Sequence, residues 1–362
     1  MRRRRVAHDL WEDQVHSPAV SVLMAVRDGQ QWLRPAVDSI LTQTFSNFEL
    51  LVIDDGSSDE TPHILGEYRA LDQRVIVIPQ AREGLVCALN RGLARATAPF
   101  VARLDADDVA LPQRLQRQLS YFEEHPKTNL LGTWAQAIDA LGRPKRLLRP
   151  PVDRKILVET LVRTNPFIHS SIMFRTAIAR ELGGYHPPFE AAEDYDFWLR
   201  FSEIGDIAIL PEVLIQYRRH GSSVTTRRAV TQVFSVRLAK QASEARRTAR
   251  DDPSSMLAAP PNWHVADGNA FYADAARLCR TLELADSAVA RNAVPSSIDL
   301  DIVFRQIPNL TAAERKLAQM VLINLIRSRM RVPHYATRSL LGLLFRLHPK
   351  RALGLLLRSD RR

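Results

Sequence analysis

Three aspartates within four residues are the part of this sequence best suited to chemistry. Asp105, Asp107 and Asp108 follow the mostly apolar run at residues 100–104. Carboxylates packed this closely repel one another, and a divalent cation neutralises that repulsion. Because oxygen ligands at this density suit Mg or Mn, the sequence predicts a site for one of these cations. A solvated Asp-rich turn without a ligand is the alternative.

A second acidic stretch, IDDGSSDET at residues 53–61, ends another apolar run. Polar groups at the carboxyl end of a strand lie in the crevice where open α/β sheets bind ligands. We expect Ser58 and Asp59 to cap the helix that follows, which should run to Leu71. Asp54 and Asp55 precede that cap and are therefore predicted to serve a ligand, with a turn-stabilising role for Asp55 as the alternative.

These acidic turns need strands that end at one edge of a sheet. Apolar runs predict buried strands at residues 20–26, 48–53, 75–78 and 100–104. Apolar faces at helical spacing predict helices between them, at residues 32–41, from the cap to Leu71, and at 85–96. Pro112 should open a further helix carrying Arg114. The alternation predicts an α/β fold whose acidic edge suits a metal that in turn binds phosphate.

Composition places the chain among globular proteins, with 46% hydrophobic and 25% charged residues. The two cysteines, Cys87 and Cys279, lack metal-ligand spacing and fit a reducing compartment. Residues 1–19 form a polar basic tail with no apolar signal-peptide core, and no window reaches the about 18 apolar residues of a membrane span. We therefore expect the protein in the cytoplasm or peripherally on the inner face of the plasma membrane.

The net charge of +10 is concentrated in residues 226–362, which hold 23 basic and 11 acidic residues. Helical periodicity is expected at residues 233–250, 268–290 and 312–330, followed by a basic, leucine-rich stretch at 339–357. Such stretches lie on anionic membranes, and a docking helix or dimer contact is the alternative. The basic residues lack interleaved aromatic side chains, so no nucleic-acid partner is expected.

Five ordered segments resemble the inverting glycosyltransferases of family 2. They are VSVLMAVRDGQQWLRPAVDSILTQTFSNFELLVIDDGSSDET, LNRGLARATAPFVARLDADDVALPQRLQRQ, NPFIHSSIMFR, EAAEDYDFWLRFSEIG and LPEVLIQYRRHGSSVT. Several motifs in order are far more specific than one. The resemblance implies a GT-A fold, a nucleotide-diphospho-sugar transferase domain with a Rossmann-like mixed sheet, at residues 20–225. Residues 226–362 would then be a basic helical C-terminal appendage.

The resemblance implies a donor site for a nucleotide diphosphate sugar, with a UDP-sugar favoured. Asp55 would accept a hydrogen bond from the nucleobase, and Asp54 would orient the backbone beside it. Asp107 would be the direct ligand of Mn or Mg, and Asp105 would contact the ribose or a metal-bound water. Asp108 is expected either to support the metal ligands without binding the metal itself or to be a carboxylate at a helix N-terminus, with equal weight. Arg103 should be a local counter-charge.

The resemblance also implies a catalytic base, Asp194, at the start of a helix. Its carboxylate would take the proton of the acceptor hydroxyl, with Glu193 and Asp196 as competitors. Stabilisation of the helix dipole is the alternative role for Asp194. His169 would lie near the diphosphate or the acceptor, or be structural.

The implied catalytic region ends in a cationic cluster. Arg218, Arg219 and His220 would clamp the diphosphate, or be surface charge. Arg27 and Asp28 depart from the family's usual aromatic and Asn at the end of the first strand, which bears on the nucleobase edge of the site.

Several functions remain to be compared. The leading hypothesis is an enzyme that adds one sugar to a glycan or lipid-linked acceptor in bacterial surface polysaccharide synthesis. A processive synthase is disfavoured because neither a QxxRW-type segment nor membrane helices follow the catalytic region. A nucleotidyltransferase would need a Gly-rich basic phosphate loop, which VRDGQQ is not. A non-catalytic membrane- or anion-binding protein is the other alternative, and it leaves the acidic motifs unexplained.

Overall fold

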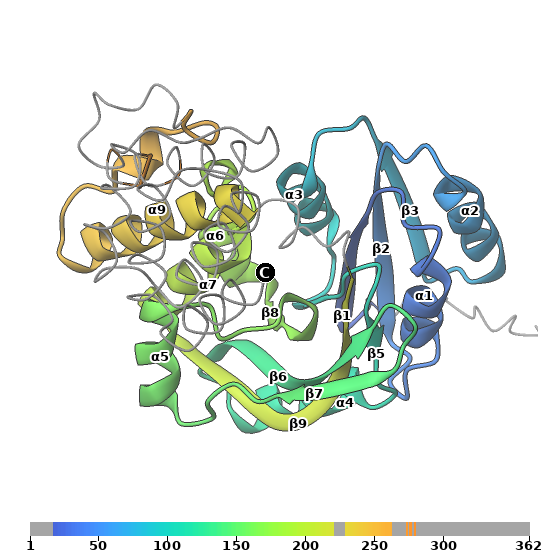
Figure 1. Ribbon diagram of the computed structural model, residues 1–362. Coiled ribbons are helices and arrows are strands. Elements are labelled where there is room, and N and C mark those ends of the chain that lie inside the picture. The colour runs from blue at the N-terminus through green and yellow to red at the C-terminus, as the bar shows by residue number, and fades with distance from the viewer. Residues whose placement is uncertain (1–16, 221–228, 263–272, 274, 277–278, 280–362) are drawn as a thin grey trace, which may run out of the picture.

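One curled sheet organises the part of the chain that the computed structural model describes, residues 17–220, 229–262, 273, 275, 276 and 279 (Figure 1). Within these residues nine strands pair in the order β3-β2-β1-β4-β8-β6-β9-β5, with β7 on β6. The strands are β1 (Val20–Val26), β2 (Phe48–Asp55), β3 (Val75–Gln80), β4 (Phe100–Arg103), β5 (Val109–Ala110), β6 (Thr128–Asp139), β7 (Pro144–Leu148), β8 (Met173–Arg175) and β9 (Asp206–Arg219).

The parallel half of the sheet follows the predicted alternation of strands and helices. β1 pairs in parallel with β2 and β4, and β2 pairs in parallel with β3. The sheet then becomes mixed, because β8 is antiparallel to both β4 and β6. The strand ends after Val26, Asp55 and Arg103 therefore meet at one edge, as expected for parallel strands.

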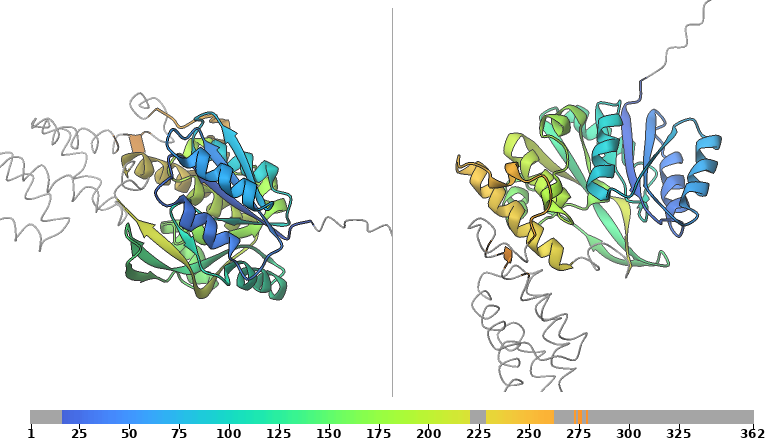
Figure 2. Two further views of the ribbon diagram at one scale, coloured as in Figure 1. Left: turned by 90° about the vertical axis from the view of Figure 1, so that its right-hand side faces the viewer. Right: turned by 90° about the horizontal axis from the view of Figure 1, so that it is seen from above.

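Helices cover both faces of the sheet (Figure 2). The helices are α1 (Leu33–Leu41), α2 (Thr61–Leu71), α3 (Leu85–Arg95), α4 (Arg114–Glu124), α5 (Arg154–Arg163), α6 (Thr176–Glu181), α7 (Glu193–Ile204) and α9 (Ala229–Arg247), with 3-10 turns η1 (His169–Ser171), η2 (Pro187–Phe189) and η3 (Pro253–Met256). Alternate residues of β1 divide the core. Val22 and Met24 pack in the cluster of α1, α2 and α4, whereas Leu23 packs in that of α3, α5, α7 and α9.

Two predicted helix starts differ from the structure in detail. α2 begins at Thr61 with Glu60 at the N-cap. Asp59 does cap this helix, since its Oδ1 accepts the Thr61 N–H at 2.9 Å, and its Oδ2 accepts the Gln30 N–H at 3.1 Å. Ser58 instead binds the neighbouring loop, since its N–H donates to Asp28 Oδ1 at 2.8 Å. α4 begins at Arg114 rather than Pro112, because the Arg114 N–H closes a turn onto the Leu111 carbonyl at 3.0 Å.

The C-terminal region is described only in part. α9 confirms a helix near the first of the expected C-terminal segments. The helices expected at residues 312–330 and 339–357, like the basic tail at residues 1–16, lie outside the described residues. Among the described helices none has the length and apolar character needed to cross a membrane.

Packing between α3 and the sheet predicts opposite effects for two helical glycines. A Cβ at Gly92 would lie 2.0 Å from Leu23 Cδ1 in the buried core, whereas a Cβ at Gly66 in α2 meets nothing within 4 Å. We expect Gly92→Ala to lower the free energy of unfolding by about 1–3 kcal/mol through overpacking. Gly66→Ala should raise it by about 0.5–1 kcal/mol. Urea unfolding of both variants measures this, and a Gly92→Ala variant as stable as Gly66→Ala would contradict the packing.

Candidate active site

The turn after β4 carries the first acidic ligand candidate, Asp105. Buried Arg103 donates from Nη2 to Asp105 Oδ1 at 2.5 Å, and Ser170 Oγ donates to Oδ2 at 2.8 Å. The Asp105 backbone N–H in turn donates to Ser170 Oγ at 3.0 Å. Burial raises the pKa of Asp105, but the Arg103 charge and these hydrogen bonds outweigh it and hold the pKa below its usual range. Arg103 is thus the expected local counter-charge.

Asp107 lies on the same turn and faces the end of β9. His220 Nε2 lies 2.7 Å from Asp107 Oδ2, and the His220 ring lies 4.1 Å from the Trp32 ring. About a third of the Asp107 side chain is exposed, at 32%. Burial and then the Asp105 charge raise the pKa of Asp107. A nearby cation would therefore stabilise the ionised form of this carboxylate.

Asp108 is the buried member of the group, at 1% exposure. Its Oδ1 accepts the Arg218 backbone N–H at 2.6 Å, whereas its buried Oδ2 has no hydrogen-bond partner within the described residues. Burial, then Asp107 and Asp105, raise its pKa well above the usual range. Asp108 is not at a helix N-terminus, because β5 follows it directly and α4 begins only at Arg114.

The three carboxylates together fit a hard divalent cation. One ligand oxygen from each of Asp105, Asp107 and Asp108 lies within 4.8 Å of the others. The unpartnered Asp108 oxygen and the raised pKa of both Asp107 and Asp108 fit a site that a nearby positive charge would stabilise. An all-oxygen donor set of this kind suits Mg or Mn.

The Arg218 side chain binds backbone carbonyl groups of two segments. Its Nε donates to the Asp107 carbonyl at 2.7 Å, and its Nη1 donates to the carbonyls of Asp139 and Ala140 at 3.3 and 3.4 Å. The side chain is nearly buried, at 7% exposure. Arg218 therefore fixes the acidic turn to the hairpin between β6 and β7, while its neighbour His220 contacts Asp107.

His169 lies on η1, one residue before the Ser170 that binds Asp105. Its Nε2 is 3.1 Å from the hydroxyl of fully buried Tyr185. Burial, and then the Arg103 charge, lower the pKa of His169 to about 3. The imidazole is therefore neutral at physiological pH.

The first turn of α7 holds Glu193 and Asp194 on the other side of the site. Asn165 Nδ2 donates to Asp194 Oδ2 at 2.8 Å, and the Tyr195 N–H donates to Oδ1 at 2.7 Å. Burial raises the pKa of Asp194 to about 6 despite these hydrogen bonds, and the Asp105 charge adds to the rise. Burial and then the Asp194 charge raise the pKa of Glu193 to about 8. The two walls of the site therefore interact electrostatically.

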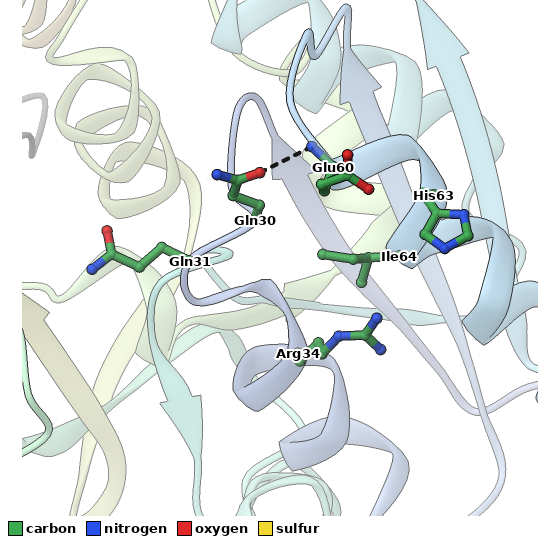
Figure 3. A pocket seen from close by; sticks show the side chains of 6 residues that line it. All are labelled: Gln30, Gln31, Arg34, Glu60, His63 and Ile64. Atoms are coloured by element: carbon green, nitrogen blue, oxygen red, sulfur yellow. Dashed lines mark hydrogen bonds between the residues drawn. The ribbon is translucent and has the colours of Figure 1, made fainter.

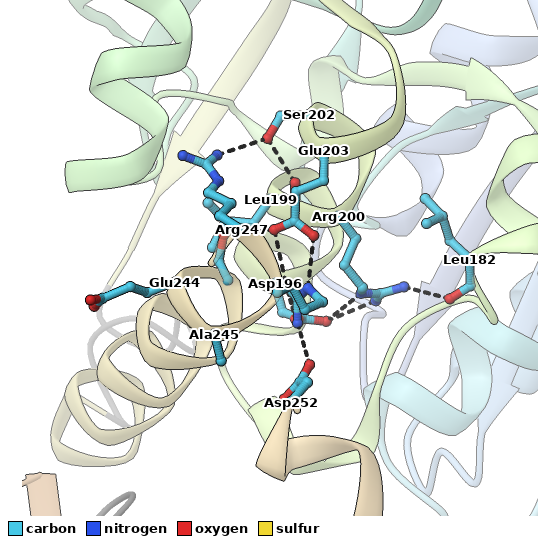
Figure 4. Close-up of polar contacts among 12 residues, drawn as sticks. Leu182, Asp196, Leu199, Arg200, Ser202, Glu203, Glu244, Ala245, Arg247 and Asp252 are labelled. Atoms are coloured by element: carbon cyan, nitrogen blue, oxygen red, sulfur yellow. Dashed lines mark hydrogen bonds and ion pairs between the residues drawn. The ribbon is translucent and has the colours of Figure 1, made fainter. Parts of the chain in front are cut away.

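Asp196, the third acid of that turn, binds Arg200 on the next turn of α7 (Figure 4). It is fully buried, and its Oδ2 accepts Arg200 Nε at 2.9 Å. From α9, Arg246 lies 3.9 Å from Asp196 Oδ1 and 2.7 Å from Glu203 Oε2, and it also pairs with Asp252. Asp196 thus belongs to the ion-pair network that attaches α9 to α7.

At the end of β2, both aspartates hold loops. Asp55 Oδ1 accepts Gln80 Nε2 at 2.7 Å and the backbone N–H groups of Glu83 and Gly84 at 2.8 and 3.0 Å. Asp54 Oδ1 accepts the Ser57 N–H at 3.0 Å. These contacts fit the turn-stabilising alternative for Asp55. Its contact with a nucleobase stays a prediction.

The neighbouring loops of β1 and β2 are joined to each other. Asp28 has a left-handed backbone (φ 50°), and its N–H donates to Ser57 Oγ at 2.9 Å. Beside this junction lies an open pocket of about 570 Å³ between the starts of α1 and α2 (Figure 3), lined by Gln30, Gln31, Arg34, Glu60, His63 and Ile64. None of the carboxylates described above lines it.

Comparison with known proteins identifies the family of this chain. The sequence model described as Glycosyl transferase family 2 matches residues 21–183. The O-antigen biosynthesis glycosyltransferase WbnJ of Escherichia coli is 35% identical over 208 residues, which cover 56% of this chain and 81% of WbnJ. The chain belongs to glycosyltransferase family 2. The amylovoran biosynthesis glycosyltransferase AmsE of Erwinia amylovora is 32% identical over 212 residues, 58% of this chain and 79% of AmsE.

Solved structures show the fold of this family 2 glycosyltransferase. The structure of Staphylococcus aureus TarS 1–349 in complex with UDP-GlcNAc matches with a TM-score of 0.54 and 16% identity, covering 92% of each chain. The TarS 1–349 complex with UDP matches with a TM-score of 0.52 and 16% identity, over 92% of this chain and 91% of TarS 1–349. The predicted GT-A fold is confirmed, and the protein is a glycosyltransferase.

Four residues that contact the acidic and histidine side chains of the site in this glycosyltransferase had no predicted role. Asn165 and Ser170 hold the carboxylates of Asp194 and Asp105, Tyr185 contacts His169, and Trp32 lies against His220. Asn165 and Ser170 belong to the NPFIHSS segment that carries the family resemblance. For these two, the signal that could have found them is an uncharged polar side chain within a segment that carries the family resemblance.

The raised pKa of Glu193 predicts a stability that falls as pH rises. The pKa of this carboxyl group is about 8 in the folded protein and 4.5 ordinarily. Below pH 4.5 the group does not reduce the free energy of unfolding, and between pH 4.5 and about pH 8 the reduction grows as pH rises. Glu193→Gln should therefore raise the free energy of unfolding by up to about 3 kcal/mol at neutral pH and leave it unchanged at pH 4. Unfolding measured across pH tests this. Glu181→Gln, at an exposed site on α6, is the control expected to show no such trend.

Proposed function

We propose that this protein is an inverting, metal-dependent glycosyltransferase that moves one sugar from a nucleotide diphosphate sugar to an acceptor hydroxyl. Two features of the site together carry the proposal. The carboxylates of Asp105, Asp107 and Asp108 could bind a cation, and Asp194 is a separate carboxylate whose pKa of about 6 lies near neutral pH. These are the two charges that sugar transfer needs: one to hold a leaving diphosphate and one to accept a proton.

The donor end of the reaction is assigned to the β4 turn. Asp107 and Asp105 would hold Mn or Mg, which supplies positive charge opposite the leaving diphosphate. His220 orients Asp107, and Ser170 with Arg103 orients Asp105. Asp55 and Asp54 shape the loops at the end of β2, where we place the nucleobase, with UDP favoured. The TarS structures in complex with UDP and UDP-GlcNAc support this choice of nucleotide.

The acceptor end is assigned to α7. Asp194 is partly exposed and mostly ionised at pH 7, so its carboxylate takes the proton of the acceptor hydroxyl. The acceptor oxygen forms a bond to the anomeric carbon from the side opposite the diphosphate. The old carbon–oxygen bond breaks with its electron pair on the nucleotide diphosphate. Glu193, mostly protonated at pH 7, can donate a hydrogen bond to a bound sugar.

The relatives support an acceptor class. WbnJ acts in O-antigen biosynthesis and AmsE in amylovoran biosynthesis. We accordingly propose a glycan or lipid-linked acceptor in bacterial surface polysaccharide synthesis, with the enzyme in the cytoplasm or peripherally on the inner face of the plasma membrane. We assign catalysis to residues 20–225, and acceptor or membrane contact to the basic region at 226–362.

Substitution of one acid at each end should separate binding from turnover. Asp107→Ala should abolish Mn-dependent binding of UDP or a UDP-sugar, whereas Asp194→Asn should retain binding and lose about 10²–10⁴-fold in kcat. Titration calorimetry with UDP, GDP and dTDP sugars, with and without Mn, measures binding, and donor hydrolysis measures turnover. Asp251→Asn, an exposed aspartate beyond α9, is the matched control. Binding of no nucleotide sugar under any condition would refute the proposal.

The hydrogen bond from Asn165 predicts a shift in the pH profile. It favours the ionised form of Asp194, whose pKa is about 6. Turnover should therefore rise with pH through about 6 in the wild type, and Asn165→Ala should move this acidic limb to higher pH while donor binding stays the same. The pH dependence of kcat at saturating donor measures the limb. A lower kcat with the limb in its original position would show that Asn165 does not tune Asp194.

A further inference from the structure

The hairpin between β6 and β7 carries a basic and apolar tip. Residues 141–147, LGRPKRL, are seven consecutive exposed residues with three basic side chains and no acidic one. Leu141 is 74% exposed and Leu147 41% exposed. Two exposed leucines therefore flank three basic side chains on one hairpin tip, a combination of apolar and positive side chains that suits an interfacial membrane contact.

The charges of this tip are only partly neutralised. Lys145 Nζ pairs with Asp139 at 3.0 Å. Arg143 and Arg146 have no acidic partner within the described residues, although both are exposed. The tip thus offers positive charge to a negatively charged surface, and its leucines offer apolar area to the layer beneath that charge.

The tip is attached to the acidic turn of the active site. Trp32 Nε1 donates to the Ala140 carbonyl at 3.3 Å, and the Trp32 ring lies against His220. Arg218 bridges the Asp139 carbonyl and the Asp107 carbonyl. A surface that binds residues 141–147 is therefore held at a set position relative to the site.

We propose that the hairpin tip, residues 141–147, docks on an anionic lipid bilayer. The basic side chains contact lipid phosphates, and Leu141 and Leu147 enter the boundary between headgroups and acyl chains. Docking there places the Asp105–Asp108 turn close to the membrane surface. Only the purpose of this docking rests on the proposed function: it would bring the donor site to a lipid-linked acceptor.

Other occupants fit the tip less well. β7 pairs only with β6 among the described strands, but Pro144 lacks an N–H and the like charges of Lys145 and Arg146 oppose pairing with a second copy. No aromatic side chain lies between residues 141 and 147 to stack on nucleic-acid bases. A soluble acidic glycan would use the arginines but would leave Leu141 exposed.

Vesicle binding of the full chain tests the docking. We expect the wild type to bind phosphatidylcholine vesicles that contain phosphatidylglycerol, to bind pure phosphatidylcholine vesicles far less, and to lose affinity with added salt. Leu141→Ser/Arg143→Gln should weaken binding to the anionic vesicles by about 10-fold or more. Co-sedimentation without donor or acceptor measures this.

A matched control lies on the last turn of α2, an element separate from the β6–β7 hairpin (Figure 1). Leu71 is 82% exposed and Arg69 is exposed two residues before it, so Arg69→Gln/Leu71→Ser removes the same chemistry elsewhere. This control should bind as the wild type does, and thermal unfolding should show both double variants folded. Hydrolysis of a soluble donor should be equal in all three proteins, which separates a failure of docking from a failure of the proposed function.

Three results would overturn the proposal. Equal binding by the wild type and the Leu141/Arg143 double variant would place membrane contact on another part of the chain. Equal weakening by the α2 control would show a nonspecific effect of charge. A wild-type dimer that light scattering finds dissociated in the hairpin variant would make the tip an interface between copies of this chain.

Discussion

Repulsion between partly desolvated carboxylates is the constraint on which this site depends. Asp105, Asp107 and Asp108 share one short turn, and the Asp105 charge reaches Asp194 on α7. Only one of these acids, Asp105, has a fully buried arginine as its direct partner, and it alone of the four has a pKa below its usual range. Arg103 therefore favours ionisation of Asp105 before its neighbours, and the Asp105 charge then raises the pKa of the neighbouring carboxyl groups.

The other large cations of the site serve the backbone and not the carboxylates. Fully buried Arg114 donates from Nη2 to the carbonyls of Arg103 and Ile172, at 2.7 and 3.0 Å. Arg218 similarly holds the Asp107 carbonyl. Planar guanidinium groups suit this because one side chain can hold two carbonyl oxygens from different segments at once. The turn is thus stiffened without neutralising the charges that would attract a metal.

Strand and helix positions could be predicted because apolar runs and apolar periodicity are local properties. The run at 20–26 and the helix after Gly84 follow directly from such patterns. The acidic edge was also foreseeable, since parallel strands end together. The contacts of Ser58 with Asp28 and of Asp59 with Gln30 were not, because these partners lie about 30 residues away in the sequence. Partners such as Asn165 for Asp194 likewise depend on tertiary approach, which spacing in one sequence does not report.

Charge balance across α7 has a consequence for how the chain divides into folding units. Asp196 is fully buried, and part of its compensating charge comes from Arg246 on α9, which also holds Glu203 and Asp252. A boundary drawn before α9 would leave these acids without that cation inside a core that α7 and α9 share. We therefore expect α7, which bears Asp194, and α9 to unfold together as one cooperative unit. The ion pairs that join them cross the apparent end of the catalytic region.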